Sequence, residues 1–219
     1  GHQLLDPIPL ADPEAVLAAA SAATPGGVAA PRTQALVLAS ASSGSASLLA
    51  MGVEPALEGQ ISIFPEALVD GEWLPDEAGR VGKAVIGRSV AKRLRVEVGD
   101  KMVLTGSDAD DRVLVRICGL FMTGSPEVDD GMMVLHRGTL GQLLEREDEV
   151  HQVAIVLEDF KQTDAVAAEL VIEGVDTLTW AEAVPQLGDY VKMDRQGADV
   201  MFFTLFALVG LAILNRILM

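Results

Sequence analysis

The sequence predicts an α+β fold followed by the start of a transmembrane helix. Helical and strand patterns alternate near both ends of the polar part of the chain, short apolar strands fill its middle, and an apolar run closes the sequence. The closing run from Met201 to Leu214 has no charged residue, so a helix built from it has no polar face. A membrane span needs about 20 mainly apolar residues, and Val200 to Met219 fits if Asn215 and Arg216 are interruptions. A buried core helix is the alternative.

The N-terminal segment predicts one helix followed by two strands. Pro13 to Ala23 is rich in alanine, and Asp12 is suited to cap its start. Gln34 to Ser40 and Ala46 to Val53 are predicted strands joined by a turn rich in serine and glycine. We expect a loop-rich crossover from Pro55 to Pro65.

The middle of the chain is predicted to be rich in β-structure. We expect short helices at Arg88 to Leu94 and at Thr139 to Glu145. Acid-rich turns are expected between strands, including the one at Glu127 to Asp130. The predicted strands are Ala84 to Gly87, the part of Val96 to Thr105 that follows Gly99-Asp100, Arg112 to Phe121, and Met132 to His136.

Helices and strands alternate again toward the C-terminus. The pattern predicts a strand at Gln152 to Leu157, a helix at Thr163 to Val171 and a strand at Val175 to Thr179. Thr179 and Glu182 have the spacing of a capping box. From Ala181 onward, helical spacing continues toward the apolar tail, which predicts a stalk helix that leads into the membrane segment.

Composition narrows the classes of function. Asp and Glu number 32 against 16 Lys and Arg, and a net charge of -16 repels nucleic-acid phosphates, so no nucleic-acid partner is expected. A single cysteine, Cys118, excludes an internal disulfide. The chain begins Gly-His without a recognisable signal peptide, and we expect it to be a fragment of a longer protein.

Nucleotide and metal motifs are not found. Gly79 to Ala84 lacks the spacing and the Ser or Thr of a phosphate loop. The carboxylates of Asp108 to Asp111 and of Glu127 to Asp130 lack the glycine and the distant glutamate of a calcium loop. His2, His136 and His151 stand alone, without metal-ligand spacing. We therefore predict neither a cofactor site nor a metal site.

No catalytic residues are predicted either. The serines of Ser40 to Ser47 form no nucleophile elbow, and no base can be assigned to them. Cys118 lies in a predicted strand and is interpreted as a small buried thiol. The sequence therefore predicts a protein that is not an enzyme.

Several short motifs follow one another in a definite order. They are Gly71 to Leu74, Ala84 to Ala91 with Leu94, Val98 to Lys101, Cys118 to Phe121, Glu127 to Asp129, Thr179-Trp180, and the closing Ile213 to Met219. Together these motifs resemble the periplasmic core domain of MacB/FtsX-type ABC-transporter permeases. The resemblance covers most of the chain from Gly59 to Met219 and is closest to the lipoprotein-releasing LolC/LolE-like branch.

This resemblance implies a two-lobed periplasmic domain, in which a split βαβ-type half surrounds an inserted β-rich half. We assign 1–63 and 150–180 to the α/β half, 64–149 to the insertion, 181–199 to a stalk helix and 200–219 to a partial transmembrane helix. Residues 1 to about 199 would lie in the periplasm, and the rest in the bacterial inner membrane.

The resemblance also implies a function. The domain would couple ATP hydrolysis by a separate cytoplasmic ABC ATPase to the movement or release of a lipid-like or lipoprotein substrate. Its other expected partners are a second permease subunit, in a homo- or heterodimer, and a periplasmic carrier or adaptor protein. Lipoprotein-releasing subunits extend one hairpin into a hook that engages the carrier, but the turn from Gly106 to Asp111 is too short for that hook.

Two alternatives remain open. One is an FtsX-like signalling module that regulates a periplasmic partner such as a cell-wall hydrolase, and the other is a MacB-like component of tripartite efflux. An apolar groove would favour lipid-like cargo, whereas an exposed apolar patch at the tip of the β-rich half would favour a protein partner.

Overall fold

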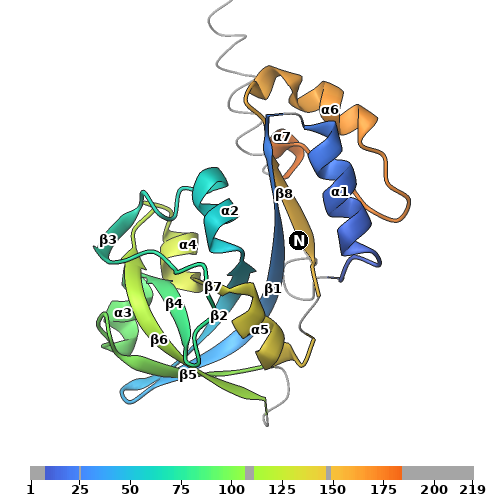
Figure 1. The fold of residues 1–219 in the computed structure, drawn as a ribbon. Helices are drawn as coiled ribbons and strands as arrows, with labels where there is room; N and C mark the ends of the chain where they lie inside the picture. The colour runs from blue at the N-terminus through green and yellow to red at the C-terminus, as the bar shows by residue number, and fades with distance from the viewer. Residues whose placement is uncertain (1–7, 25, 107–110, 147–148, 184–219) are drawn as a thin grey trace, which may run out of the picture. The chain divides into compact units, whose positions relative to one another are not determined.

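The computed structural model describes residues 8–24, 26–106, 111–146 and 149–183 (Figure 1). The chain divides into two compact units, Gly1–Gln162 and Thr163–Met219. The first unit contains all of the named strands, and the described part of the second contains two short helices.

A closed mixed sheet forms the centre of the first unit. Its six strands follow the order β1, β2, β7, β4, β6, β5 and return to β1, which pairs with both β2 and β5. The β2–β7 and β4–β6 pairs are parallel, and the other pairs are antiparallel. The strands are β1 (Val28–Ala41), β2 (Gly44–Val53), β4 (Gly82–Gly87), β5 (Lys101–Thr105), β6 (Arg112–Phe121) and β7 (Met132–His136).

Two further strands attach to this closed sheet. The first part of β1, from Val28 to Arg32, pairs with β8 (Gln152–Val156), whereas the rest pairs with strands of the closed sheet. Strand β3 (Leu68–Gly71) pairs with the end of β6. Because β1 is long enough to have both sets of partners, it runs without interruption from its pairing with β8, which we call the β8 ribbon, into the closed sheet.

Side chains fill the inside of the closed sheet. Along β1, Ala35, Val37 and Ala39 are buried, while Leu36 and Leu38 are exposed, as the period of two predicts. Small alanines suit the narrow interior of a six-stranded sheet, which has room only for packed side chains. Leucines of the helices α3 (Arg88–Leu94) and α5 (Arg137–Leu144) complete this core.

A second core covers part of the outer face of the closed sheet. Met51, Val85 and Phe121 point outward from their strands and pack with Phe64 and Leu74 of the covering segment. The rings of Phe64 and Phe121 meet edge to face, with centroids 5.0 Å apart. The covering segment includes helix α2 (Pro55–Ile61) and strand β3, and helix α4 (Pro126–Gly131) contributes Val128.

Helix α1 (Pro13–Ala23) packs against β1 and β8 in the first unit. Its N-cap is Asp12, as predicted, and the carboxylate accepts a hydrogen bond from the amide of Ala15 at 3.0 Å. A short 3-10 helix, η1 (Phe160–Gln162), ends this unit.

The second unit begins with helix α6 (Thr163–Glu169) and ends, within its described part, with helix α7 (Trp180–Ala183). The Glu182 carboxylate accepts hydrogen bonds from the amide and the hydroxyl of Thr179, both at 2.9 Å. The expected reach of Glu182 back to the N-cap amide is therefore confirmed. The remainder of the predicted stalk and the predicted membrane segment lie outside the described residues.

Three predicted elements need correction. The segment from Pro55 to Pro65 is not a simple loop, because Pro55 starts helix α2 and fixes the backbone angle of its first turn. The acid-rich Glu127–Asp130 stretch is not a turn but part of α4, which begins at Pro126. Val175 to Thr179 is not a strand, since only an isolated bridge joins Ile172 to Val175.

Most strands of the closed sheet and α1, α3 and α5 lie close to their predicted positions, but β1 begins at Val28, well before the predicted Gln34. Strands β1 and β2, which the sequence assigned to the α/β half, pair with β5 and β7 of the β-rich segment, so all belong to one sheet. The α+β class is confirmed, and the proposed domain boundaries remain a prediction. Over the described ranges, no helix combines the length and the apolar character that crossing a membrane requires.

Candidate functional site

Motifs between Gly71 and Phe121 that carry the resemblance meet around β6. Residues Gly71 and Gly119 are registered partners in the β3–β6 pair, and the amide of Glu72 donates to the carbonyl oxygen of Cys118 at 2.8 Å. A Cβ atom at Gly71 would overlap that same carbonyl oxygen, and Gly71 also has a positive φ of 78°. The glycine therefore permits the close approach of the two motif strands.

A second pair of motifs meets where β4 leads into α3. Gly87 ends β4 and caps α3, and a Cβ atom there would overlap the carbonyl oxygen of Asp129 in α4. The glycine of the Val-Ile-Gly motif is thus required because the backbone of the Glu-Val-Asp motif lies against it.

Asp129 holds the loop before α4 in place. Its side chain accepts hydrogen bonds from the amide and hydroxyl of Thr123, at 2.7 and 2.9 Å, and from the amide of Gly124 at 3.0 Å. Burial, at 6% exposure, acts to raise the pKa of this carboxyl group, but the three hydrogen bonds outweigh it and the pKa is lowered. Sequence reasoning had assigned Asp129 to an ordinary acidic turn.

Cys118 lies in β6, next to the motif glycine Gly119. It is half-buried, packs against the outer core, and its thiol donates to the carbonyl oxygen of Ala84 at 3.4 Å. Burial raises the pKa of the thiol, Lys83 lowers it and Glu72 raises it. A thiol with a raised pKa is a poor nucleophile, which agrees with its interpretation as a packing residue.

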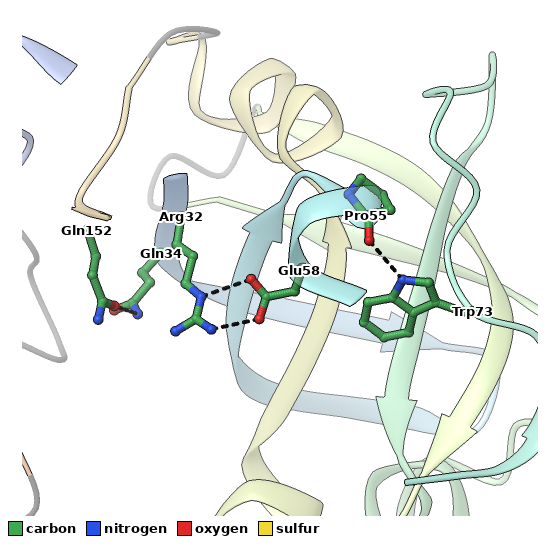
Figure 2. Close-up of polar contacts among 6 residues, drawn as sticks. All are labelled: Arg32, Gln34, Pro55, Glu58, Trp73 and Gln152. Carbon is green, nitrogen blue, oxygen red and sulfur yellow. Dashed lines mark hydrogen bonds and ion pairs between the residues drawn. The ribbon is translucent and has the colours of Figure 1, made fainter. Parts of the chain in front are cut away.

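A buried ion pair fixes β1 at the point where its partners change. Arg32 is the last residue of β1 paired with β8 and the first paired with β2. Its guanidinium group binds both carboxylate oxygens of Glu58 in α2, at 3.0 and 2.7 Å (Figure 2). The Glu58 side chain is fully buried, and that of Arg32 is 18% exposed. We call this pair the β1 clamp.

Neighbouring contacts support the β1 clamp. The indole of Trp73 donates to the carbonyl oxygen of Pro55, the first residue of α2, at 3.3 Å, and Gln34 on β1 donates to Gln152 on β8 at 3.1 Å (Figure 2). The ring Nδ1 of His151 accepts a hydrogen bond from the backbone amide of Gln34 at 3.2 Å. Burial lowers the pKa of His151, with a further lowering from Arg146 and an opposing rise from Glu149. The two Gln34 contacts tie β1 to β8 and to the residue before it, and the Trp73 contact ties α2 to the segment that follows β3.

The β1 clamp was not predicted, because Arg32 and Glu58 belong to no motif and are far apart in the sequence. Glu58 lies in a segment that the sequence predicted to be rich in loops, so its burial was not indicated either.

Other predicted positions are dispersed. His136 caps α5, its Nδ1 accepting the amide of Gly138, and its other ring nitrogen lies 3.1 Å from the carbonyl oxygen of Asp76. His2 and Asp108 to Asp110 lie outside the described residues. Among the residues that are described, no group of His, Cys, Asp and Glu side chains has the arrangement of a metal site.

The fold and the site define a class. The chain is an α+β domain with a closed six-stranded mixed sheet, and the motif glycines Gly71 and Gly87 serve the packing of strands and helices around β6. The family model described as the MacB-like periplasmic core domain matches residues 3–172, which is more than half of the chain. The chain therefore belongs to this family, and it is the extracytoplasmic domain of an ABC-type permease.

Two solved structures resemble the chain. The extracellular domain of the noncanonic ABC-type transporter YknZ from Gram-positive bacteria has a TM-score of 0.53 at 12% identity, over 74% of this chain and 86% of that chain. A domain of a permease protein from Porphyromonas gingivalis has a TM-score of 0.40 at 18% identity, over 67% of this chain and 70% of that one. No curated protein matches the sequence.

Proposed function

We propose that this domain is a non-catalytic element of a permease subunit that transmits motion from a cytoplasmic ATPase to a lipid-like or lipoprotein substrate outside the membrane. The β1 clamp is the observation that carries the proposal. Strand β1 is shared by the β8 ribbon and the closed sheet, and the Arg32–Glu58 pair holds it at the junction.

A mechanical role needs parts that move as one body. A buried bidentate pair of arginine and carboxylate is more restrictive in geometry than an exposed pair. The clamp also joins α2 to β1. Through the Trp73–Pro55 hydrogen bond, α2 is joined in turn to the segment from Gly71 to Leu74. A displacement applied to the paired strands β8 and β1 would therefore reach the segment from Gly71 to Leu74 without being absorbed by bending at Arg32. Motion of coupled rigid elements is an established type of conformational switching.

The experiment uses the complete permease with its ATPase partner, and compares Arg32→Lys with the wild type. Lysine keeps the charge but cannot make the bidentate contact with Glu58. We expect the ATP hydrolysis rate to stay within about two-fold, while the amount of cargo moved per ATP hydrolysed falls. Thermal melting establishes that the variant is folded at the assay temperature.

Arg137→Lys is the matched control. Arg137 pairs with Glu54 at 2.9 Å, but both side chains are partly exposed, at 25% and 33%, so the same exchange should leave the coupling ratio unchanged. Equal ratios for Arg32→Lys and the wild type would contradict a mechanical role for the clamp. Turnover of ATP or of a hydrolase substrate by the chain alone would contradict the non-catalytic assignment.

A second candidate function is an FtsX-like or efflux-type module that docks a periplasmic protein. One observation favours it: Ile63, Val69 and Met122 are 58%, 42% and 50% exposed. The carbonyl oxygen of Ile63 accepts a hydrogen bond from the amide of Ala67, and the carbonyl oxygen of Ala67 accepts one from the amide of Met122, both at 2.9 Å. Ile63 and Met122 therefore belong to one small region. Co-purification of the complete permease with candidate adaptors, compared with Ile63→Ser, separates this candidate from the first.

A further inference from the structure

The strands of the closed sheet carry no acidic side chains. None of the six contains Asp or Glu, although the chain has 32 acidic residues and only 16 basic ones. Acidic groups lie next to the sheet instead. Asp100 precedes β5, and its carboxylate accepts a hydrogen bond from the amide of Glu97 at 2.9 Å, while Asp70 and Glu72 lie in and just after β3. The outward face of β5 and of the neighbouring part of β6 is therefore basic or neutral.

Three basic side chains lie side by side on this face. Arg116 in β6 is the registered partner of Lys83 in β4 and of Lys101 in β5, and all three are exposed. None of them belongs to an ion pair within the described part of the chain. The Arg116 guanidinium group donates only to a carbonyl oxygen, that of Gly99, at 3.1 Å. Like charges opposite each other on neighbouring strands repel, so an anion from outside the chain relieves this repulsion.

An exposed apolar strip adjoins the three basic side chains. Leu114 in β6 is 41% exposed, and its registered partner in β5 is Val103. Leu36 and Leu38 continue the strip on β1, where they are 46% and 41% exposed. Leu38 is the partner of Thr105, two residues along β5 from Val103, so Leu38 and Val103 are diagonal neighbours. We call the apolar strip together with the three basic side chains the β5 face.

The side chains of the β5 face point away from the inner core. Val37, Met102 and Val115, which alternate with them along the strands, belong to that core, and successive side chains of a strand point to opposite faces. The outer core covers the sheet farther along β4 and β6, at Val85 and Phe121. Strands β1, β5, β6 and β4 follow one another in the sheet (Figure 1). The β5 face is thus one continuous exposed surface that combines cations with large apolar side chains.

We propose that the β5 face binds the anionic headgroup surface of a membrane. Its basic side chains contact lipid phosphates, and its leucines enter the boundary between headgroups and acyl chains, since both kinds of contact strengthen binding to an anionic membrane surface. The net charge of the chain is -16, so the same membrane repels the acidic remainder of its surface. Attraction is therefore confined to the β5 face. This contact is separate from the β1 clamp and from the apolar C-terminal segment.

The combination of charge and apolar surface favours lipid over other occupants. A soluble polyanion pairs with the cations but leaves the exposed leucines in water. A neutral apolar partner buries Lys101 and Arg116 without a counter-charge, which is costly, and a second copy of the same face brings like charges together. A phospholipid surface supplies phosphate groups and an apolar layer next to each other, and so satisfies both parts of the β5 face.

Lysine acetylation tests the proposal in the complete chain of 219 residues, reconstituted in nanodiscs. Mass spectrometry measures the acetylation rate of each lysine in discs of phosphatidylcholine, with and without phosphatidylglycerol. We expect phosphatidylglycerol to slow the acetylation of Lys83 and Lys101 about five-fold or more, and added salt to reverse the effect. Lys161 in η1 is also exposed and is the internal control, whose rate should change by less than about two-fold.

Leu36→Ser with Leu114→Ser tests the apolar part of the contact. We expect this variant to lose most of the protection by phosphatidylglycerol, because its cations alone hold the surface more weakly. The control carries Val171→Ser with Leu178→Ser, which are 83% and 60% exposed in the second unit, and should be protected like the wild type. Thermal melting establishes that both variants are folded.

Three results overturn the proposal. In the wild type, phosphatidylglycerol could leave the acetylation of Lys83 and Lys101 unchanged, or it could slow Lys161 equally. Soluble polyglutamate, added to discs of phosphatidylcholine, could protect Lys83 and Lys101 as well as phosphatidylglycerol does, which would assign the β5 face to an acidic polypeptide. None of these results bears on the β1 clamp, which is tested by the amount of cargo moved per ATP hydrolysed.

Discussion

At the scale of single residues, Asp129 shows how a polar side chain in this domain stabilises a loop. Its carboxylate accepts three hydrogen bonds from Thr123 and Gly124, and its backbone carbonyl oxygen lies against Gly87. The side chain is nearly buried, so its charge depends on these donors instead of on water. It is the tertiary position of the loop that turns an acidic residue of the sequence into a structural one.

Asp129 should give the domain a specific dependence on pH. Its pKa is lowered in the folded state, so it contributes stability above the unfolded pKa of about 3.9, and this contribution is lost as the pH falls through the folded pKa. We expect Asp129→Asn to reduce the free energy of unfolding by about 2 kcal/mol at pH 7. The difference from wild type should shrink below about pH 4.

Urea unfolding at several pH values measures this difference. Thr123→Ala removes one of the donors and should show a smaller effect with the same dependence on pH. A difference between wild type and Asp129→Asn that stays constant from pH 7 to about pH 3 would rule out this role of the carboxylate.

At the scale of elements, most strands of the closed sheet were predictable because each contains a short apolar run bounded by turn residues. Ala84 to Gly87 and Arg112 to Phe121 are apolar runs bounded by turn residues, and both appear as strands. Helices α2 and α4 were missed because each is short and starts at a proline that was interpreted as part of a loop or turn. Closure of the sheet was not predictable, since pairing depends on partners far apart in the sequence.

The packing of α4 on β4 gives a prediction at this scale. Gly87→Ala places a Cβ atom against the Asp129 carbonyl oxygen, which belongs to the backbone and cannot rotate away. We expect a loss of about 2 kcal/mol in the free energy of unfolding. Gly131→Ala, at the end of α4, meets no atom within 4 Å and should change stability by no more than about 0.5 kcal/mol.

Chemical denaturation of both variants makes the comparison. Equal stability of Gly87→Ala and Gly131→Ala would mean that α4 can shift away from β4 without cost, against the interpretation of the motif glycine as a packing requirement.

At the scale of the whole molecule, an acidic extracytoplasmic domain is combined with an apolar C-terminal segment. The family assignment covers residues 3–172, and the predicted membrane segment, 200–219, follows it in the sequence. A permease domain must be connected to the membrane in order to receive motion from an ATPase on the other side. The apolar run from Met201 to Leu214 is the part of this chain whose composition suits that connection.

Membrane attachment through this run is testable by extraction. We expect the chain, expressed in a bacterium, to remain with the membrane after alkaline carbonate treatment. Leu208→Lys with Leu211→Lys should release it, because each central lysine costs about 3 kcal/mol in a membrane helix. Two lysines at exposed positions of α1, Ala18→Lys with Ala22→Lys, add the same charge and should leave the chain membrane-bound. Release of both variants, or of neither, would contradict attachment by this segment.

The sequence by itself determined the α+β class, the positions of most strands and the order of the family motifs, because these depend on local periodicity and on residue type. It also indicated the absence of a recognisable catalytic motif. Only the tertiary structure decided that the strands close into one sheet and that Arg32 binds Glu58. These features join residues from separate segments, so their energies depend on distances in the folded chain.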